Sequence, residues 1–428
     1  MRDPRADGAP PSPPVEPSTR ATTVLIAAAS TAANLLGYAF NAIMSRALGV
    51  AGYGELASLL AVVVVATVAG TALQAVIARR LSSGGGATGL VRSILVVATA
   101  VAVAVAALAP VLRAFLDVGT YPPVLWMAVS LLPTTIAFGW QGLLQGNGRF
   151  GALGALLIAV QAARVVGAGV AGLTRTGTSV AFAVTTAGTL AVVVAVAGSV
   201  ARPGSDRRAA AHVSGTILLR DVVRDIAPIL GVLVLSNLDL LLARHYLGAH
   251  DSGLYAAGNL VTRAAFWGPA FVVLVTYPRL AVPAQRAAAL RHGTQWLVII
   301  ALLGLIASVA ASGAVPLLLG ADYRGVSDLA WIFTAEGLAL VGTQFAVFAG
   351  LALQDRRLGR VVWLAVALEC LVVGFLAHGS LAQIVIVAAG CAVGLLIVAA
   401  GVELRRPPVV DSGSAGLRHP LAGGAPAA

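Results

Sequence analysis

Long apolar stretches dominate this sequence from residue 22 to residue 404, and only short segments rich in Arg, Gly and Pro separate them. Of the 428 residues, 59% are hydrophobic and 11% are charged, whereas about a quarter of the residues in a soluble domain are charged. A helix needs about 20 apolar residues to cross the hydrocarbon core of a bilayer. The composition therefore excludes a water-soluble enzyme and predicts an all-α polytopic membrane protein.

The apolar stretches provide for twelve transmembrane helices. We predict spans at 22–45, 54–78, 91–116, 122–146, 150–173, 177–200, 224–247, 253–278, 293–319, 325–352, 359–378 and 381–404. Residues 1–21 and 405–428 are predicted to be disordered tails. Residues 201–223 are predicted to link two halves of six spans each, 22–200 and 224–404.

The arginines alternate between the loops in a way that orients these spans. All 28 basic residues are Arg, and 21 of them fall in the tails and loops on the side of the N-terminus, while five fall on the opposite side and two lie within spans. By the positive-inside rule, we expect both termini on the cytoplasmic side of the cell membrane. The net charge of +11 is then a topology signal, with contact to membrane lipids, and does not indicate nucleic-acid binding. The absence of Lys also excludes a P-loop for nucleotides.

The two predicted halves repeat one motif at an offset of about 200 residues. Residues 46–53 read RALGVAGY and residues 244–255 read RHYLGAHDSGLY, so both contain Arg, then Leu-Gly, then Gly and Tyr. Because each half has an even number of spans, both halves cross the membrane in the same sense. This pattern predicts two parallel-repeat six-helix bundles around a central cavity.

Residues 236–248 (SNLDLLLARHYLG), followed by Gly253-Leu254-Tyr255, resemble the seventh span of polysaccharide flippases, and residues 48–54 are similar to their opening. Those flippases belong to the multidrug/oligosaccharidyl-lipid/polysaccharide (MOP) exporter superfamily, and the resemblance covers roughly residues 22–404. It implies a MATE-like fold and export of an undecaprenyl-pyrophosphate-linked oligosaccharide by alternating access, together with other polysaccharide-assembly membrane proteins. The sequence lacks the fourteen spans and the basic residues in the first two spans that are usual in lipid II flippases.

Polar residues inside the spans are the candidates for a substrate site, because a charge at mid-bilayer costs about 2.5 to 3.5 kcal/mol. Asn259, Arg263 and Trp267 follow one another at i, i+4 and i+8 and form one stripe on the eighth span. A guanidinium can bind a pyrophosphate bidentately, while an amide can bind sugar hydroxyls and an indole can stack on a sugar. The alternative is that Arg263 pairs with Asp239 or Glu336 and locks the bundle.

A second stripe is expected in the other half. Arg164 follows Gln161 at i+3 on the fifth span, so both can face the cavity, although Arg164 could instead snorkel outward. Asn34 and Asn41 recur at helical spacing on the first span. They are candidates for the cavity wall, or for polar contacts between helices.

Buried acids are the candidates for energy coupling, because nothing in the sequence can hydrolyse ATP. Asp239 with the nearby Asn237, Glu336 and Glu369 could hold a coupling Na⁺ or H⁺. The alternative is that these acids neutralise an arginine. The six His show no metal-ligand spacing, and no cofactor motif or catalytic constellation is present, so we expect neither a metal site nor an enzyme.

Two other functions stay open at this point. One is an ion-coupled multidrug or small-metabolite antiporter of the same fold, for which a predominantly acidic cavity would be expected. The other is a non-transporting membrane scaffold or a glycan polymerase, for which long polar outer loops would be expected.

Overall fold

The structure, a computed structural model, describes residues 19–82, 84, 89–174, 177–200, 219–280, 282–310, 312–353 and 357–405. Within these residues the secondary structure is entirely helical. The helices are α1 (Thr19–Ala66), α2 (Val68–Ser82), α3 (Leu90–Ala107), α4 (Ala109–Phe115), α5 (Tyr121–Gly146), α6 (Phe150–Thr174), α7 (Thr178–Val200), α8 (Leu219–Tyr246), α9 (Ala249–Trp267), α10 (Ala270–Leu280), α11 (Pro283–Ala310), α12 (Ala314–Leu319), the 3₁₀ helix η1 (Ala321–Leu329), α13 (Ala330–Leu351), α14 (Arg357–Phe375) and α15 (Leu381–Leu404).

Eleven helical stretches in the described part of the chain are long and apolar enough to cross a membrane. The first, Val24–Ser82, has 59 residues, which is about 90 Å of helix at 1.5 Å per residue. That length is about three times the hydrocarbon core of a bilayer, and Gly49 interrupts it with φ 67° and ψ 179°. The stretch therefore supplies the first two of the twelve predicted spans, and a glycine is required at the break because other residues rarely adopt this φ.

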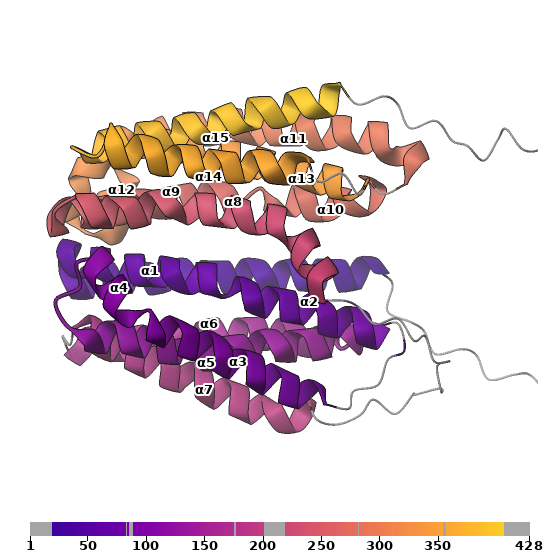
Figure 1. Cartoon of the computed structure of the whole chain (residues 1–428), viewed down its shortest axis with the longest axis horizontal. Helices are drawn as coiled ribbons and strands as arrows, with labels where there is room; N and C mark the ends of the chain where they lie inside the picture. Colours follow the sequence, from indigo (N-terminus) through magenta and orange to yellow (C-terminus); the bar gives the residue numbers. More distant parts are fainter. Residues whose placement is uncertain are drawn as a thin grey trace, which may run out of the picture.

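The helices form two bundles, as the sequence predicted (Figure 1). Helices α1–α7 make up the N-terminal half, and α8–α15 with η1 make up the C-terminal half. Helix α1 packs against α8 and α9 where the halves meet. The described ends of the chain, Thr19 and Arg405, lie at the same end of the molecule, on the right in Figure 1. We call this the termini end.

The two halves contain equivalent hydrogen bonds, as expected from the repeated sequence motif. In the N-terminal half, the hydroxyl of Tyr53 donates to Oδ1 of Asn41 over 3.0 Å. In the C-terminal half, the hydroxyl of Tyr255 donates to Oδ2 of Asp239 over 2.8 Å. The two tyrosines belong to the repeated motif, so the halves share this contact, but its acceptor is a neutral amide in one half and a carboxyl group in the other.

Three predicted spans are divided in the structure. The span predicted at 91–116 consists of α3 and α4, the span at 253–278 of α9 and α10, and the span at 293–319 of α11 and α12. The first two breaks lie beside prolines, because Pro110 is in the first turn of α4 and Pro269 lies between α9 and α10. Proline lacks the N–H that would continue the helical ladder.

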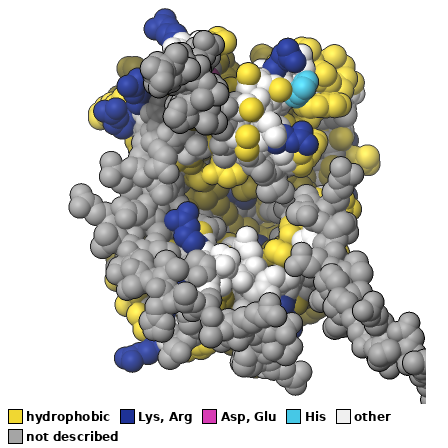
Figure 2. Space-filling model, turned by 90° about the vertical axis from the view of Figure 1, so that its right-hand side faces the viewer, with side chains coloured by type: hydrophobic (Ala, Val, Ile, Leu, Met, Phe, Trp, Pro, Cys, Tyr) yellow, Lys and Arg dark blue, Asp and Glu magenta, His cyan; other side chains and the backbone are white. Residues whose placement is uncertain are grey.

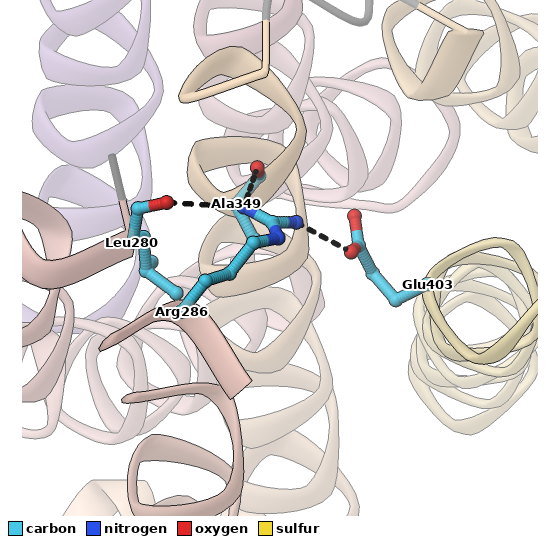
Figure 3. Close-up of polar contacts among 4 residues, drawn as sticks. All are labelled: Leu280, Arg286, Ala349 and Glu403. Carbon is cyan, nitrogen blue, oxygen red and sulfur yellow. Dashed lines mark hydrogen bonds and ion pairs between the residues drawn. The ribbon is translucent and has the colours of Figure 1, made fainter. Parts of the chain in front are cut away.

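An ion pair stabilises the C-terminal half at its termini end (Figure 3). Nη2 of Arg286 lies 3.1 Å from Oε2 of Glu403. Nη1 of Arg286 donates to the carbonyl oxygens of Leu280 and Ala349 over 3.3 Å and 3.0 Å. One buried guanidinium thus joins the end of α10 and helices α11, α13 and α15 into one unit.

Candidate substrate cavity

A cavity of about 420 Å³ lies among α1, α5, α6 and α7, and α9 of the opposite half contributes to its wall. Figure 2 looks at the molecule from the termini end and shows a hollow between the two halves. Small-molecule sites commonly have volumes of about 300 to 1,000 Å³. The polar lining consists of Asn34, Tyr38, Asn41, Thr67, Ser130, Thr134, Gln141, Gln161, Arg164, Thr185, Thr186, Thr189 and Arg263.

Two arginines from opposite halves look into this cavity, Arg164 from α6 and Arg263 from α9. Nη1 of Arg164 donates to Oε1 of Gln161 over 3.2 Å, and its guanidinium lies 4.8 Å above the ring of Phe40. Nη2 of Arg263 donates to Oδ1 of Asn237 over 2.7 Å. Within the described residues, neither arginine has a carboxylate within 4 Å. Both guanidinium groups line the same cavity, so an anion bound there could interact favourably with both positive charges.

Within the described residues, Arg263 does not form the ion pair with Asp239 or Glu336 that the sequence left open as an alternative. Asp239 accepts from Tyr255 and, over 3.3 Å, from Nδ2 of Asn259, while Glu336 accepts from Thr262 over 3.3 Å. The partner of Arg263 is instead the neutral amide of Asn237. Arg263 therefore has a neutral hydrogen-bond partner and no direct ion pair within the described residues, and it lines the cavity.

The three residues of the predicted stripe on the eighth span, Asn259, Arg263 and Trp267, lie in two different environments. Arg263 and Trp267 line the cavity, and Trp267 is 43% exposed. Asn259 is 1% exposed and faces Asp239, so it lies outside the lining. The helical spacing is as predicted, but α9 turns its first residue of the stripe toward the core of its own half.

The candidates on the first and fifth spans all line the cavity. Gln161 accepts from Arg164 and donates to the carbonyl of Ala33 over 3.4 Å. The side chain of Asn41 donates to the carbonyl of Gly37 over 2.8 Å and accepts from Tyr53, so its polar atoms are already satisfied. Asn34 is exposed in the lining, where it is available to a ligand.

The acidic candidates form a separate buried cluster in the C-terminal half. Asp239 on α8, Glu336 on α13 and Glu369 on α14 are each at most 1% exposed, and their carboxylates interact electrostatically. Oδ1 of Asp239 and Oε1 of Glu369 have no hydrogen-bond partner within the described residues. No group of three His, Cys, Asp or Glu in that part of the chain has metal-site geometry. Asn237 and Asn259 connect this cluster to Arg263, because one binds Arg263 and the other binds Asp239.

Three threonines of α7, Thr185, Thr186 and Thr189, line the cavity, although they were not predicted from the sequence. Oγ1 of Thr186 is buried and has no partner within the described residues, whereas Thr189 donates to the carbonyl of Thr185 over 2.8 Å. Hydroxyls at i and i+4 in an otherwise apolar span are the signal that could have identified this face.

The structure resembles solved MATE transporters at low sequence identity. A eukaryotic MATE transporter, AtDTX14, superposes with a TM-score of 0.61 and 12% identity over 91% of this chain and 96% of that one. An outward-facing multidrug resistance MATE family transporter of the MOP superfamily superposes with a TM-score of 0.58 and 14% identity over 88% and 93%. A MOP superfamily transporter from Pyrococcus furiosus gives 0.57 and 13% over 88% and 93%.

No protein-family model matches the sequence, and no curated protein matches it either. The structural likeness extends over about nine-tenths of the chain, so the chain has the fold of the MATE transporters of the MOP superfamily. The eleven long apolar helical stretches of the described residues agree with a protein that crosses the membrane several times.

Proposed function

We propose that the protein is a flippase that moves an undecaprenyl-pyrophosphate-linked oligosaccharide across the cytoplasmic membrane by alternating access, for cell-surface polysaccharide biosynthesis. The observation that carries this proposal is the pair of guanidinium groups, Arg164 and Arg263, which line one cavity from opposite halves without a carboxylate partner in the described part of the chain. A pyrophosphate is a dianionic bidentate acceptor, which guanidinium groups bind well.

The rest of the lining suits the sugar part of such a substrate. Hydroxyl and amide groups of α5, α6 and α7 surround the two arginines, and sugar hydroxyls can exchange hydrogen bonds with them. Trp267 offers an aromatic face beside Arg263. The polyprenyl tail would stay in the bilayer while the headgroup passes through the cavity.

An ion gradient would supply the energy for the cycle, and the buried acids would couple it to transport. Asp239 and Glu369 each have one oxygen without a partner in the described residues, and an unpaired buried charge is costly. Binding of H⁺ or Na⁺ would remove that cost. Because Asn259 and Asn237 link Asp239 to Arg263, occupancy of the acid cluster can alter the substrate site.

An ion-coupled antiporter for drugs or small metabolites is the second candidate, and the three buried acids favour it. Its cationic substrates would meet two arginines in the cavity, which would repel them. The cavity polarity therefore favours the anionic headgroup.

The test is flipping by Arg263→Gln and Arg164→Gln variants in reconstituted vesicles that contain a labelled polyprenyl-pyrophosphate oligosaccharide. Glutamine keeps hydrogen-bonding capacity but lacks the charge, so we expect the rate to fall at least tenfold while insertion and thermal stability are retained. The matched control is Arg113→Gln, because Arg113 caps the carbonyls of Val118 and Gly119 and does not line the cavity. Unchanged flipping by both cavity variants would disprove the proposal.

A further inference from the structure

The repeated Arg–Leu–Gly–Gly–Tyr motif lies where the two halves meet, at the end opposite the termini end. This is the left side of Figure 1, where α4 and α12 lie. The motif residues of one half contact the short helix of the other half at this place. The cavity lining that the flippase proposal uses does not include these residues.

In the first copy of the motif, Arg46 reaches across to α12. Its Nη2 donates to the carbonyl of Leu317 over 2.7 Å. The neighbouring Ser45 donates to the carbonyl of Leu319 over 3.2 Å, and Tyr323 donates back to the carbonyl of Ser45 over 3.1 Å. The last carbonyls of a helix have no partner within the helix, so the motif satisfies them from the other half.

In the second copy, Arg244 reaches across to the end of α4 in the same manner. Its Nε donates to the carbonyl of Leu116 over 2.8 Å, and its Nη2 donates to the carbonyl of Asp117 over 3.0 Å. The adjacent His245 stacks on Phe115 with ring centroids 4.4 Å apart. Donors and acceptors are thus repeated at the offset of about 200 residues that relates the two halves.

Between the two arginine contacts, the backbones of the halves touch through the motif glycines. A Cβ on Gly54 would lie 2.8 Å from the Cα and N of Gly253, and a Cβ on Gly253 would overlap the carbonyl of Val50. Only residues without a side chain allow this approach. At this point the two halves meet backbone to backbone, and aromatic side-chain contacts flank the glycines, with Tyr53 packing edge-to-face on Tyr323 and Phe115 stacking on His245.

The chemistry of these contacts suits a seam that opens and closes. All of the arginine hydrogen bonds between the halves end on main-chain carbonyls, and water can replace such donors when the halves separate. Glu55 and Asp117 are near enough to interact with Arg244 electrostatically, but neither forms an ion pair with it within the described residues. In contrast, the C-terminal half contains an internal ion pair between Arg286 and Glu403.

We propose that the two copies of the motif form a double latch, in which Arg46 and Arg244 each hold the short helix of the opposite half, and that this end opens only when both latches release. This latch would give the repeated motif a function, because the motif residues do not line the substrate cavity. It would stabilise the state seen in the structure, in which the end opposite the termini end is closed.

The test measures distances in the full chain by electron–electron double resonance, in a background with Cys370 and Cys391 replaced by Ala. Spin labels at the exposed positions 120 and 322 report on the latched end, and labels at 93 and 291 report on the termini end. We expect Arg244→Ala and Arg46→Ala to increase the population with a long 120–322 distance at least tenfold, with a matching shortening between 93 and 291. The double variant should shift further than either single variant.

Two further variants are measured in the same way: one is a control that should not open the latched end, and the other should open it by a different route. Arg113→Ala removes an arginine at the same end that bonds only within its own half, to Val118 and Gly119, and should leave both distances unchanged. Gly54→Ala should open the latched end by steric overlap. Because Arg46 is exposed, its variant is expected to stay folded, which a thermal melt verifies.

Unchanged distances in the double variant, or an equal shift in Arg113→Ala, would overturn the latch. The readout uses no substrate, so its result is independent of the flippase assignment.

Discussion

The acid at position 239 offers the sharpest test of energy coupling, because the protein contains a neutral counterpart of it. Tyr255 donates to Asp239 as Tyr53 donates to Asn41. In Asp239→Asn, the amide oxygen can accept from Tyr255 in the same way, so we expect the variant to fold. The substitution removes the negative charge and with it the capacity to bind H⁺ or Na⁺.

The magnitude follows from the number of free acceptor atoms. Asp239 has one oxygen, Oδ1, without a partner in the described residues, so it offers a place for one univalent cation per cycle. A tenfold gradient of such an ion supplies about 1.4 kcal/mol, which corresponds to a tenfold accumulation of substrate. Loss of one coupled cation in the Asp239→Asn variant should lower the accumulation ratio about tenfold, while downhill flipping continues.

The assay uses proteoliposomes in which a pH gradient and a Na⁺ gradient are imposed separately. The fraction of labelled oligosaccharide in the outer leaflet is measured with an impermeant glycosidase. Tyr255→Phe is the matched control, because it removes one hydrogen bond and retains the carboxyl group, and it should keep the gradient response. If Asp239→Asn responds to both gradients like the unsubstituted protein, the coupling role of this acid is refuted.

Two further predictions concern single contacts. Glu403→Gln removes the charge that faces Arg286, whose side chain is 8% exposed, and should lower the unfolding free energy by about 1 to 3 kcal/mol, visible as a lower midpoint in a thermal melt; an unchanged midpoint would contradict the role of this ion pair. Thr186→Val replaces a buried hydroxyl that has no partner in the described residues by a methyl group, so we expect equal or higher thermal stability but about five- to tenfold weaker binding of the oligosaccharide substrate. Unaltered affinity would show that this hydroxyl does not face the sugar.

The sequence predicted the architecture well, because its physical signals are strong. The cost of polar groups in hydrocarbon restricts each span to an apolar stretch, and the alternation of arginines tests the number of spans. The Tyr53–Asn41 and Tyr255–Asp239 contacts show that the repeat read from short motifs corresponds to equivalent positions in three dimensions. The continuous helical stretch from Val24 to Ser82 was not foreseen, because a single glycine separates its two spans.

The site was only partly predictable. Arg164 and Arg263 were identifiable because a charge in a span needs water or a polar partner. The sequence could not show that Arg263 binds the amide of Asn237 and not a carboxylate, because that choice depends on how α8 and α9 rotate against each other. The same rotation turns Asn259 away from the cavity, toward Asp239.

We infer that Arg164 and Arg263, which share one cavity and have no direct ion pair within the described residues, receive an anionic headgroup. Equilibrium binding of a purified polyprenyl-pyrophosphate oligosaccharide to the purified protein, beside binding of a cationic dye, measures this most directly. We expect the lipid-linked sugar to bind and the dye to bind poorly. Each of the variants Arg164→Gln and Arg263→Gln should weaken binding of the lipid-linked sugar by about 1.5 to 3 kcal/mol, or roughly 10- to 150-fold. Tight binding of the dye to the unsubstituted protein, or full affinity for the lipid-linked sugar after loss of both arginines, would contradict this inference.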